Sequence, residues 1–336
     1  MSASRTTPHV FSVDVEEYFQ VNAFEGFVSR ESWDELPSRV EAGVHTLLEL
    51  LDGYDAKGTF FTLGWIADRH PHVVRAITEA GHEIASHGWW HRRVVTLTRE
   101  QFRDEVRDSR LLLEDVTGTQ VLGYRAPSFS ILPRVEWAYD VLLEEGYRYD
   151  SSVFPIRRRD YGNPRATPHA HVVKRSGGEI LELPMATTRI AGVRVPGAGG
   201  AYLRLLPFWI TRRVLRESAG RGESAVLYVH PWEIDPEQPR LDVRMLARLR
   251  HYSGLDRTLP RLRRLLDEFV FVSIAQRYGE ELGAPRVLPE AAAPRPAEPE
   301  RATAAGGADP GAPASRREDT REATGGTTDR RVPGTE

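Results

Sequence analysis

Residues 81–91 read Gly-His-Glu-Ile-Ala-Ser-His-Gly-Trp-Trp-His, a glycine and a short apolar run that leads to two histidines. The run predicts a buried strand, which delivers His87 and His91 into the loop or first helical turn beyond it. Imidazoles at positions i and i+4 lie on one helical face, where they can share a metal ion. A pair of surface histidines would have the same spacing, so the metal site depends on companion residues elsewhere in the chain.

Short apolar runs alternate with helical patterns on both sides of this stretch. Residues 39–54 carry apolar side chains at helical spacing, and the β-rich run 57–62 follows them. Residues 72–80 form a second helical pattern, and residues 98–117 form a longer one that begins with a capping box. Such alternation is typical of a parallel sheet, and a large number of units favours closure into a barrel. We therefore expect an α/β fold.

Changes of composition divide the chain into regions. Residues 1–8 form an N-terminal extension, and the repeating domain extends over residues 9–283. Within it the rhythm breaks at about residues 154–207, where turn signals and short apolar runs predict a β-rich insertion over the barrel mouth. Residues 284–336 are rich in Pro, Ala, Gly, Glu and Arg and contain no aromatic side chain, so we expect a disordered tail with no chemistry.

Composition narrows the possible functions. The 336 residues are 40% hydrophobic, which suffices for a real core, and the formal net charge of -3 gives no electrostatic reason to expect nucleic acid or an anionic membrane as a partner. The chain has no cysteine, so disulfides and cysteine-ligated zinc are excluded, and a metal must bind histidine, carboxylate or water. We see no signal peptide and no integral membrane segment. The expected location is the cytoplasm, with a peripheral position at the inner membrane as the second option.

Ionisable side chains end several of the predicted strands. The first strand ends in Asp14 and Glu16, which share one face because strand side chains alternate, while Glu17 points the other way. Two carboxylates that face one spot repel each other unless a cation lies near them. Arg125 ends a later strand and could clamp a carboxylate bidentately. Acids that merely open a solvated loop would look the same.

Two further strand ends carry candidates. One strand ends at Asp150, and the apolar run 224–229 is followed by His230 and a proline. A single histidine in such a place is more often structural than catalytic. His230 becomes a candidate because several other predicted strands also end in polar residues, and the C-terminal ends of barrel strands form the active sites of barrel enzymes.

These segments resemble, in order and spacing, the five motifs of the NodB-homology polysaccharide deacetylases. The matching segments are Asp14 with Glu16, His87-Gly-Trp-Trp-His91, Arg125-Ala-Pro127, Tyr149-Asp150-Ser and Leu227-Tyr-Val-His230-Pro. The resemblance covers residues 9–280 and implies a distorted (β/α)7 TIM-like barrel of the NodB-homology type. The start Asp-Val-Glu-Glu-Tyr-Phe and the ending His-Pro-Trp-Glu look most like the branch found in exopolysaccharide loci with exosortase (PEP-CTERM) systems.

The resemblance implies a metal site. A divalent metal ion, most often zinc, would be held by His87, His91 and an acid of the first motif. That motif departs from the common pair of adjacent aspartates. We therefore assign Glu16 as the ligand and Asp14 as the general base, while Asp14 as a ligand and Glu17 as a competitor stay open.

The resemblance also implies the remaining roles. Arg125 would keep the base ionised, and His230, held by Asp150, would protonate the departing amine. The backbone N–H of Ser128 would be an oxyanion donor. The further substrate contacts that we expect are Leu227 and Trp232.

The implied function is a metal-dependent hydrolase of linear amide C–N bonds. It would remove acetyl groups from N-acetylhexosamine units of an exopolysaccharide or of its lipid-linked oligosaccharide precursor. Two alternatives remain: a related amidohydrolase acting on peptidoglycan or a small amide, such as an allantoinase-like enzyme, and a non-catalytic glycan-binding or scaffold protein. The presence of both Asp14 and His230 favours an enzyme, because a pseudoenzyme of this fold can lose either residue.

Overall fold

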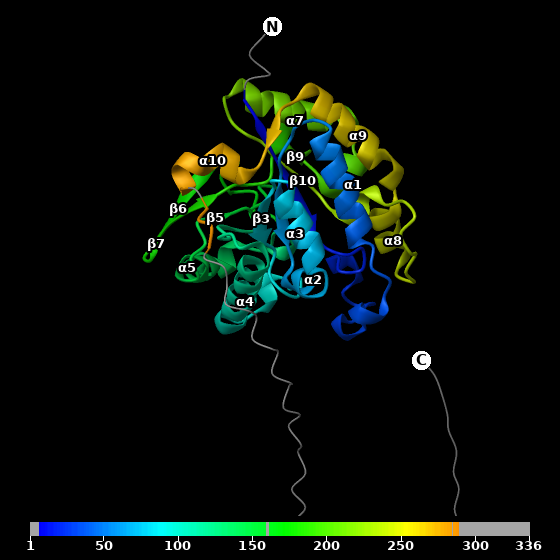
Figure 1. Ribbon diagram of the computed structural model, residues 1–336. Coiled ribbons are helices and arrows are strands. Elements are labelled where there is room, and N and C mark those ends of the chain that lie inside the picture. Colours follow the sequence, from blue (N-terminus) through cyan, green and yellow to red (C-terminus); the bar gives the residue numbers. More distant parts are fainter. Residues whose placement is uncertain (1–6, 159–160, 284, 289–336) are drawn as a thin grey trace, which may run out of the picture. The chain divides into compact units, whose positions relative to one another are not determined.

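The computed structural model describes residues 7–158, 161–283 and 285–288 (Figure 1). Most of the expected N-terminal extension and of the expected tail lies outside these residues. The described strands are β1 (His9–Val15), β2 (Thr59–Thr62), β3 (Glu83–Ser86), β4 (Gly123–Tyr124), β5 (Tyr149–Asp150), β6 (His171–Arg175), β7 (Gly178–Glu182), β8 (Thr187–Ile190), β9 (Val193–Pro196), β10 (Val226–Val229) and β11 (Phe271–Val272).

The main sheet is almost entirely parallel. Its order is β10-β1-β2-β3-β4-β5-β7-β6, and β11 pairs with the start of β1. Within the order, the pair of β6 with β7 is antiparallel. Beyond β7, Met185 forms a parallel bridge with Val226 of β10, which joins the two sides of the parallel part at one point. The α/β class is thus confirmed, and this bridge is the contact that supports closure into a barrel.

Helices surround the strands on the outside, as Figure 1 shows for α1, α3, α4, α7 and α9. The helices are α1 (Val40–Asp52), α2 (Gly64–Arg69), α3 (Pro71–Glu79), α4 (Arg99–Thr117), α5 (Trp137–Glu144), α6 (Gly200–Leu205), α7 (Phe208–Gly220), α8 (Met245–Tyr252), α9 (Leu255–Glu268) and α10 (Ile274–Leu282). None of these described helices is long and apolar enough to cross a bilayer. Thr98 and Gln101 form the expected capping box of α4.

Alternation along β1 separates two cores. Phe11 and Val13 belong to an outer cluster in which the strands pack against the helices, whereas Val10 belongs to an inner cluster. Ser12 and Asp14 share the face of Val10, since strand side chains alternate. The inner face therefore changes from apolar to polar toward the C-terminal end of β1, and this gradient places the site at that end.

The expected insertion is β-rich, but its strands do not form a cover over the mouth. β7 pairs with β5 in register and is part of the main sheet. β8 and β9 form a separate hairpin that packs against α7, where Thr188 donates to Glu217 at 2.6 Å. Among the described residues of the insertion, Tyr161 and four residues of α6, Gly200, Ala201, Tyr202 and Arg204, line the site.

The first described residues of the expected tail are paired with the domain. Val287 forms an antiparallel bridge with Thr119, and Gln120 donates its backbone N–H to the carbonyl of Arg286 at 3.0 Å. Residues 285–288 are therefore paired with the loop after α4 rather than disordered. The rest of the expected tail, 289–336, lies outside the described residues.

Gly123 of β4 makes room for an aromatic ring inside the sheet. A Cβ atom at this position would lie 1.9 Å from Cζ of Tyr149 on β5. The ring is held in place because its hydroxyl donates to Glu83 Oε1 at 2.8 Å. Any side chain larger than hydrogen at position 123 would force this inner packing apart.

We predict that Gly123→Ala destabilises the domain, by about 1–3 kcal/mol or more, because overpacking a close-packed core costs this much. Thermal unfolding followed by circular dichroism measures the loss. Gly177→Ala is the matched control, since a Cβ there meets nothing within 4 Å. A melting temperature of Gly123→Ala equal to that of the control would contradict the packing argument, and Tyr149→Val added to Gly123→Ala should restore part of the loss.

Candidate active site

The loop after β3 carries the two histidines. The chain turns at Gly88, whose φ of 78° is a left-handed conformation that suits glycine. Glu105 of α4 fixes the turn, because its Oε2 accepts the backbone N–H groups of Trp89 and Trp90 at 2.7 and 3.0 Å. His91 has a φ of 50°, so the two histidines come together in a turned loop and not on a helical face.

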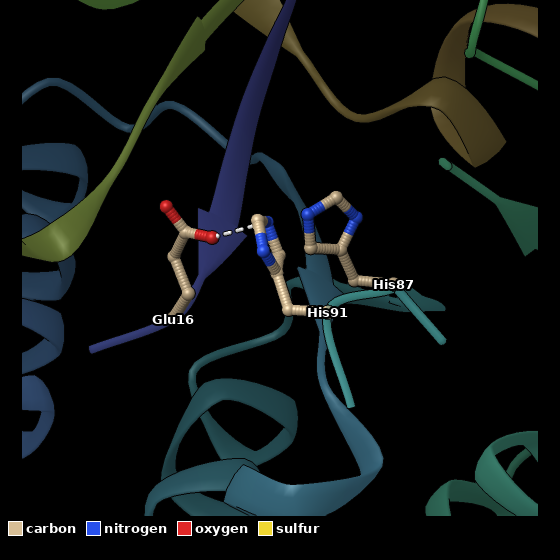
Figure 2. A group of neighbouring side chains, drawn as sticks. All are labelled: Glu16, His87 and His91. Atoms are coloured by element: carbon tan, nitrogen blue, oxygen red, sulfur yellow. Dashed lines mark ion pairs between the residues drawn. The ribbon is translucent and has the colours of Figure 1, made fainter. Parts of the chain in front are cut away.

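Glu16 and the two histidines point toward one another (Figure 2). Their possible ligand atoms all lie within 4.8 Å of one another, and all three side chains are buried. His91 Nε2 lies 2.7 Å from Glu16 Oε2. His87 Nδ1 donates to the carbonyl of Arg125 at 2.7 Å, which orients the ring and leaves Nε2 for a ligand. This donor set fits a divalent metal ion that prefers histidine and carboxylate.

Burial and neighbouring charges set the protonation of this cluster. Burial lowers the pKa of His87 to about 4, so its imidazole is neutral near neutral pH. Burial alone would raise the pKa of Glu16, but the imidazoles of His91 and His230 outweigh it and hold that pKa below its ordinary value. An ionised carboxylate and a neutral imidazole are the forms that bind metal ions.

Asp14 lies beside the cluster and is held by Arg125. Its Oδ1 accepts from Arg125 Nη1 at 2.6 Å. The guanidinium, which is fully buried, also donates to Ser12 Oγ at 2.9 Å and to the carbonyl and hydroxyl oxygens of Ser151 at 3.1 and 2.9 Å. Its Cζ lies 3.9 Å from the centre of the Phe61 ring. The structure thus brings Asp14, Glu16 and Arg125 together, but the expected bidentate clamp is not formed, because Arg125 gives Asp14 one hydrogen bond and directs Nε and Nη2 to Ser151.

Glu17 points away from the cluster. Its carboxylate accepts the backbone N–H groups of Arg39 and Val40, at 3.0 and 3.2 Å, and the hydroxyl of Ser38. These groups stand at the N-terminus of α1, so Glu17 caps that helix. The structure therefore does not place Glu17 where it could compete for the metal.

His230 follows β10 and faces both acids. Its Nε2 lies 3.5 Å from Glu16 Oε1 and 3.8 Å from Asp14 Oδ2. Its Nδ1 donates to Glu233 Oε2 at 2.8 Å, and Glu233 Oε1 accepts from Arg204 Nε at 2.7 Å. Burial would lower the pKa of His230, but the carboxylates of Glu233 and Glu16 raise it to about 9.

The expectation that Asp150 holds His230 is wrong. Asp150 accepts the backbone N–H and the hydroxyl of Ser152 at 3.1 and 2.6 Å, and it pairs with Glu182 of β7. The physical reason is alternation: Tyr149 is part of the inner cluster, so the next residue on β5 faces outward. The partner of His230 is Glu233.

The acids and histidines line a cavity of about 270 Å³. One part of its wall is aromatic and consists of Phe129, Tyr161, Tyr202 and Tyr228. Arg93 and Arg250 add positive charge to the lining. The cavity therefore combines flat apolar faces, which suit a sugar ring, with the reactive polar groups.

The three expected substrate contacts have different outcomes. Ser128 lines the cavity with a φ of 54°, and Trp232 lines it while its Nε1 donates to Glu16 Oε1 at 3.0 Å. Leu227 does not line it, because this side chain belongs to the outer core. Tyr228 lines the cavity instead, since it shares a strand face with His230.

Sequence reasoning overlooked several residues of the site. Glu233 follows His230 by three positions within the quoted His-Pro-Trp-Glu segment, so the local spacing could have revealed it. Arg204 and His251 had no comparable signal. His251 stacks on Trp232 with ring centres 4.2 Å apart, a contact between positions that the chain brings together only on folding.

The Asp150–Glu182 pair predicts a pH dependence of stability. Burial raises the pKa of both carboxyls, so the folded state favours their protonated forms. A raised folded pKa gives stability that is present at acidic pH and lost as pH rises through the raised values. We expect the melting temperature to fall less between acidic and alkaline pH in Glu182→Gln than in the wild type. Glu179→Gln, exposed on the same strand, is the control, and parallel curves for all three proteins would contradict the pairing.

Comparisons with known proteins add family evidence. Residues 32–148 match the family model described as polysaccharide deacetylase, and residues 151–278 match a domain of unknown function, DUF3473. The chain is 32% identical over 115 residues to a peptidoglycan deacetylase of Helicobacter pylori, a match that covers 34% of this chain and 38% of that protein. The chain thus spans less than half the length of that curated relative.

Two solved structures share the fold. One is a Mycobacterium smegmatis protein assigned as a polysaccharide deacetylase, with a TM-score of 0.53 and 22% identity, covering 86% of this chain and 96% of that chain. The other is the Puue allantoinase, with a TM-score of 0.52 and 18% identity, covering 83% of this chain and 92% of that chain. At these identities the likeness concerns the fold alone. Over residues 32–148 the chain is thus similar to the polysaccharide deacetylases, and over residues 151–278 it is similar to DUF3473.

Proposed function

We propose that this protein is a metal-dependent N-deacetylase that hydrolyses the acetamide of N-acetylhexosamine units in a glycan and releases acetate. The observation that carries the proposal is the buried group of Glu16, His87 and His91, flanked by Asp14 and His230 in one cavity. This arrangement combines a possible metal site with two groups that can transfer protons, a combination suited to metal-assisted amide hydrolysis.

The metal ligands in this proposal are Glu16, His87 and His91. A mixed histidine and carboxylate set suits zinc, and the absence of cysteine leaves the set without thiolate. When bound, such an ion would supply Lewis acidity toward a water molecule and the acetamide carbonyl. Trp232 supports the ligand set, because its indole N–H donates to Glu16 and limits the rotation of that carboxylate.

Asp14 is the proposed general base. Its carboxylate lines the cavity, and Arg125 binds one of its oxygens while the other faces His230. The hydrogen bond from the buried Arg125 guanidinium fixes the orientation of this carboxylate in the cavity. Asp14 is thereby held for proton abstraction from a water in the cavity.

His230 is the proposed proton donor to the departing amine. Glu233 accepts from Nδ1, so the ring presents Nε2 toward the cavity. The backbone N–H of Ser128 is the proposed hydrogen-bond donor to the oxyanion, because Ser128 lines the same cavity. Asp150 has no part in this scheme.

The proposed substrate is an N-acetylated glycan. Aromatic side chains in the lining can stack on a pyranose ring, and the relative from Helicobacter pylori is named for peptidoglycan. The resemblance of residues 14–19, Asp-Val-Glu-Glu-Tyr-Phe, and of residues 230–233, His-Pro-Trp-Glu, to the exosortase-associated branch favours an exopolysaccharide or its lipid-linked precursor. Acetate release from exopolysaccharide and from peptidoglycan, measured side by side, distinguishes these substrates.

We predict separate effects for the ligands and the base. His87→Ala should lose the bound divalent ion, since too few protein ligands remain for tight binding. Asp14→Asn should keep the ion and lower the rate of acetate release by roughly 10²–10⁴-fold, the usual range for general base catalysis. Elemental analysis and acetate assays check both. His45→Ala, on an exposed residue, is the control.

Other outcomes have definite meanings. Full metal occupancy in His87→Ala would remove the metal site from the proposal. A wild type that holds metal and binds glycan but releases no acetate would show a glycan-binding protein instead of an enzyme.

The partner of His230 gives a further prediction. Glu233→Gln should lower kcat with little change in KM, because the orientation of His230 matters chiefly in the transition state. Asp150→Asn should lower kcat much less than Glu233→Gln does, since Asp150 faces the outer side of β5. The steady-state kinetics of both variants on one acetylated oligosaccharide decide the matter. The reverse order of effects would restore Asp150 as the partner.

A further inference from the structure

α8 presents an apolar face to solvent. Met245, Leu246 and Leu249 have exposed fractions of 73%, 78% and 56%. Leu249 lies three and four positions after Leu246 and Met245, and helix residues at these spacings are neighbours, so Leu249 joins the other two side chains into one surface. Isolated exposed apolar side chains are ordinary, but a cluster of long ones on a single helix marks a contact surface.

The segment after β1 adds to this surface. Phe27 is 47% exposed, and the guanidinium of Arg244 lies 5.8 Å from its ring centre. Phe27, Met245, Leu246 and Leu249 are called the α8 face below. No described residue is packed over them to the extent that would bury them.

The charges along α8 itself are mostly positive, while the segment around Phe27 also carries the exposed acids Glu25 and Glu31. Residues 240–250 contain four arginines and one aspartate, in a chain whose net charge is -3. Arg244 and Arg248 are exposed and flank the apolar residues along the helix. Arginine can keep its charged end in water while its stem lies along an apolar surface, as in helices at membrane interfaces.

The α8 face lies next to the candidate active site. Arg250 and His251, at the C-terminal end of α8, line its cavity. Leu249 directly precedes them, and Leu246 lies roughly 6 Å from Arg250 along the helix axis at 1.5 Å per residue. α8 and the segment after β1 can be followed in Figure 1, where they lie at one edge of the domain.

We propose that the α8 face docks on a membrane surface that carries anionic lipids. The apolar side chains would enter the boundary between headgroups and acyl chains, and the arginines would contact the lipid phosphates. A protein partner fits less well, because the surface of four side chains is far smaller than the roughly 800 Å² of surface that each partner buries in a stable interface. The contact would hold the cavity near a glycan attached to a lipid, and this consequence rests on the proposed function. The docking on the membrane is independent of that function.

Vesicle binding tests the proposal. The full chain is sedimented with vesicles of phosphatidylcholine plus phosphatidylglycerol and with vesicles of phosphatidylcholine alone. We expect binding to the anionic vesicles that weakens as salt is added, since salt screens exposed charges. Met245→Ser, Leu246→Ser and Leu249→Ser combined should weaken that binding by roughly tenfold or more.

Charge variants test the second part of the surface. Arg244→Gln with Arg248→Gln should weaken binding to the anionic vesicles by roughly fivefold for each arginine. Arg75→Gln with Arg263→Gln, two exposed arginines on α3 and α9, is the matched charge control. Leu111→Ser, Val193→Ser and Val270→Ser combined is the apolar control, because these residues are exposed by 50%, 65% and 51% elsewhere on the domain.

Several results would overturn the proposal. Absence of binding to anionic vesicles by the full chain is the first. The second is an equal loss of vesicle binding in the variants of the α8 face and in their controls, with melting temperatures that show all variants to be folded. A chain whose mass in solution is that of a dimer, reduced to a monomer by the three serine substitutions, would assign the α8 face to a second copy. If vesicle binding appears only after residues 289–336 are deleted, that segment is the occupant.

Discussion

The buried guanidinium of Arg125 is the contact on which the site depends. It joins Asp14 and Ser12 on β1 to Ser151 after β5, and Arg125 itself follows β4. Removing one partner of a buried ion pair typically costs about 3–5 kcal/mol, because the other charge stays buried without compensation. The same contact orients the proposed base. Stability of the inner face and the chemistry of the site therefore rest on one side chain, and Phe61 beneath the guanidinium excludes water from it.

The strand pattern predicted much of the site correctly. Alternation placed Asp14 and Glu16 on one face, and the structure shows both on the inner side while Glu17 caps α1. The alternation of strands and helices predicted a parallel sheet, since buried runs between helices have few other arrangements. His87 and His91 do converge, but through a loop held by Glu105. The spacing of the histidines alone could not reveal that loop, because its hydrogen bonds go to Glu105 on α4 and not to residues of the loop itself.

The errors follow from carrying motifs over without applying the same alternation. Asp150 follows Tyr149, whose ring fills the inner cluster, so Asp150 faces the helices and pairs with Glu182. Leu227 likewise precedes Tyr228, which lines the cavity. Both placements could have been predicted from the sequence, because strand side chains alternate between the two faces of the sheet. The roles of Arg204 and His251 were not, because their contacts with Glu233 and Trp232 arise from tertiary packing.

The support of His230 shows that the site is distributed over the whole domain. Arg204 on α6 donates to Glu233 and also to the carbonyls of His251 and Ser253, so it connects the insertion to the end of α8. Both histidines of the proposed metal site lie within the segment that matches the polysaccharide deacetylase model, whereas His230 and Glu233 lie in the segment that matches DUF3473. The acids of β1 lie in neither segment. Neither matched segment therefore contains a complete site, and the proposed hydrolysis requires the two segments and β1 to fold as one unit.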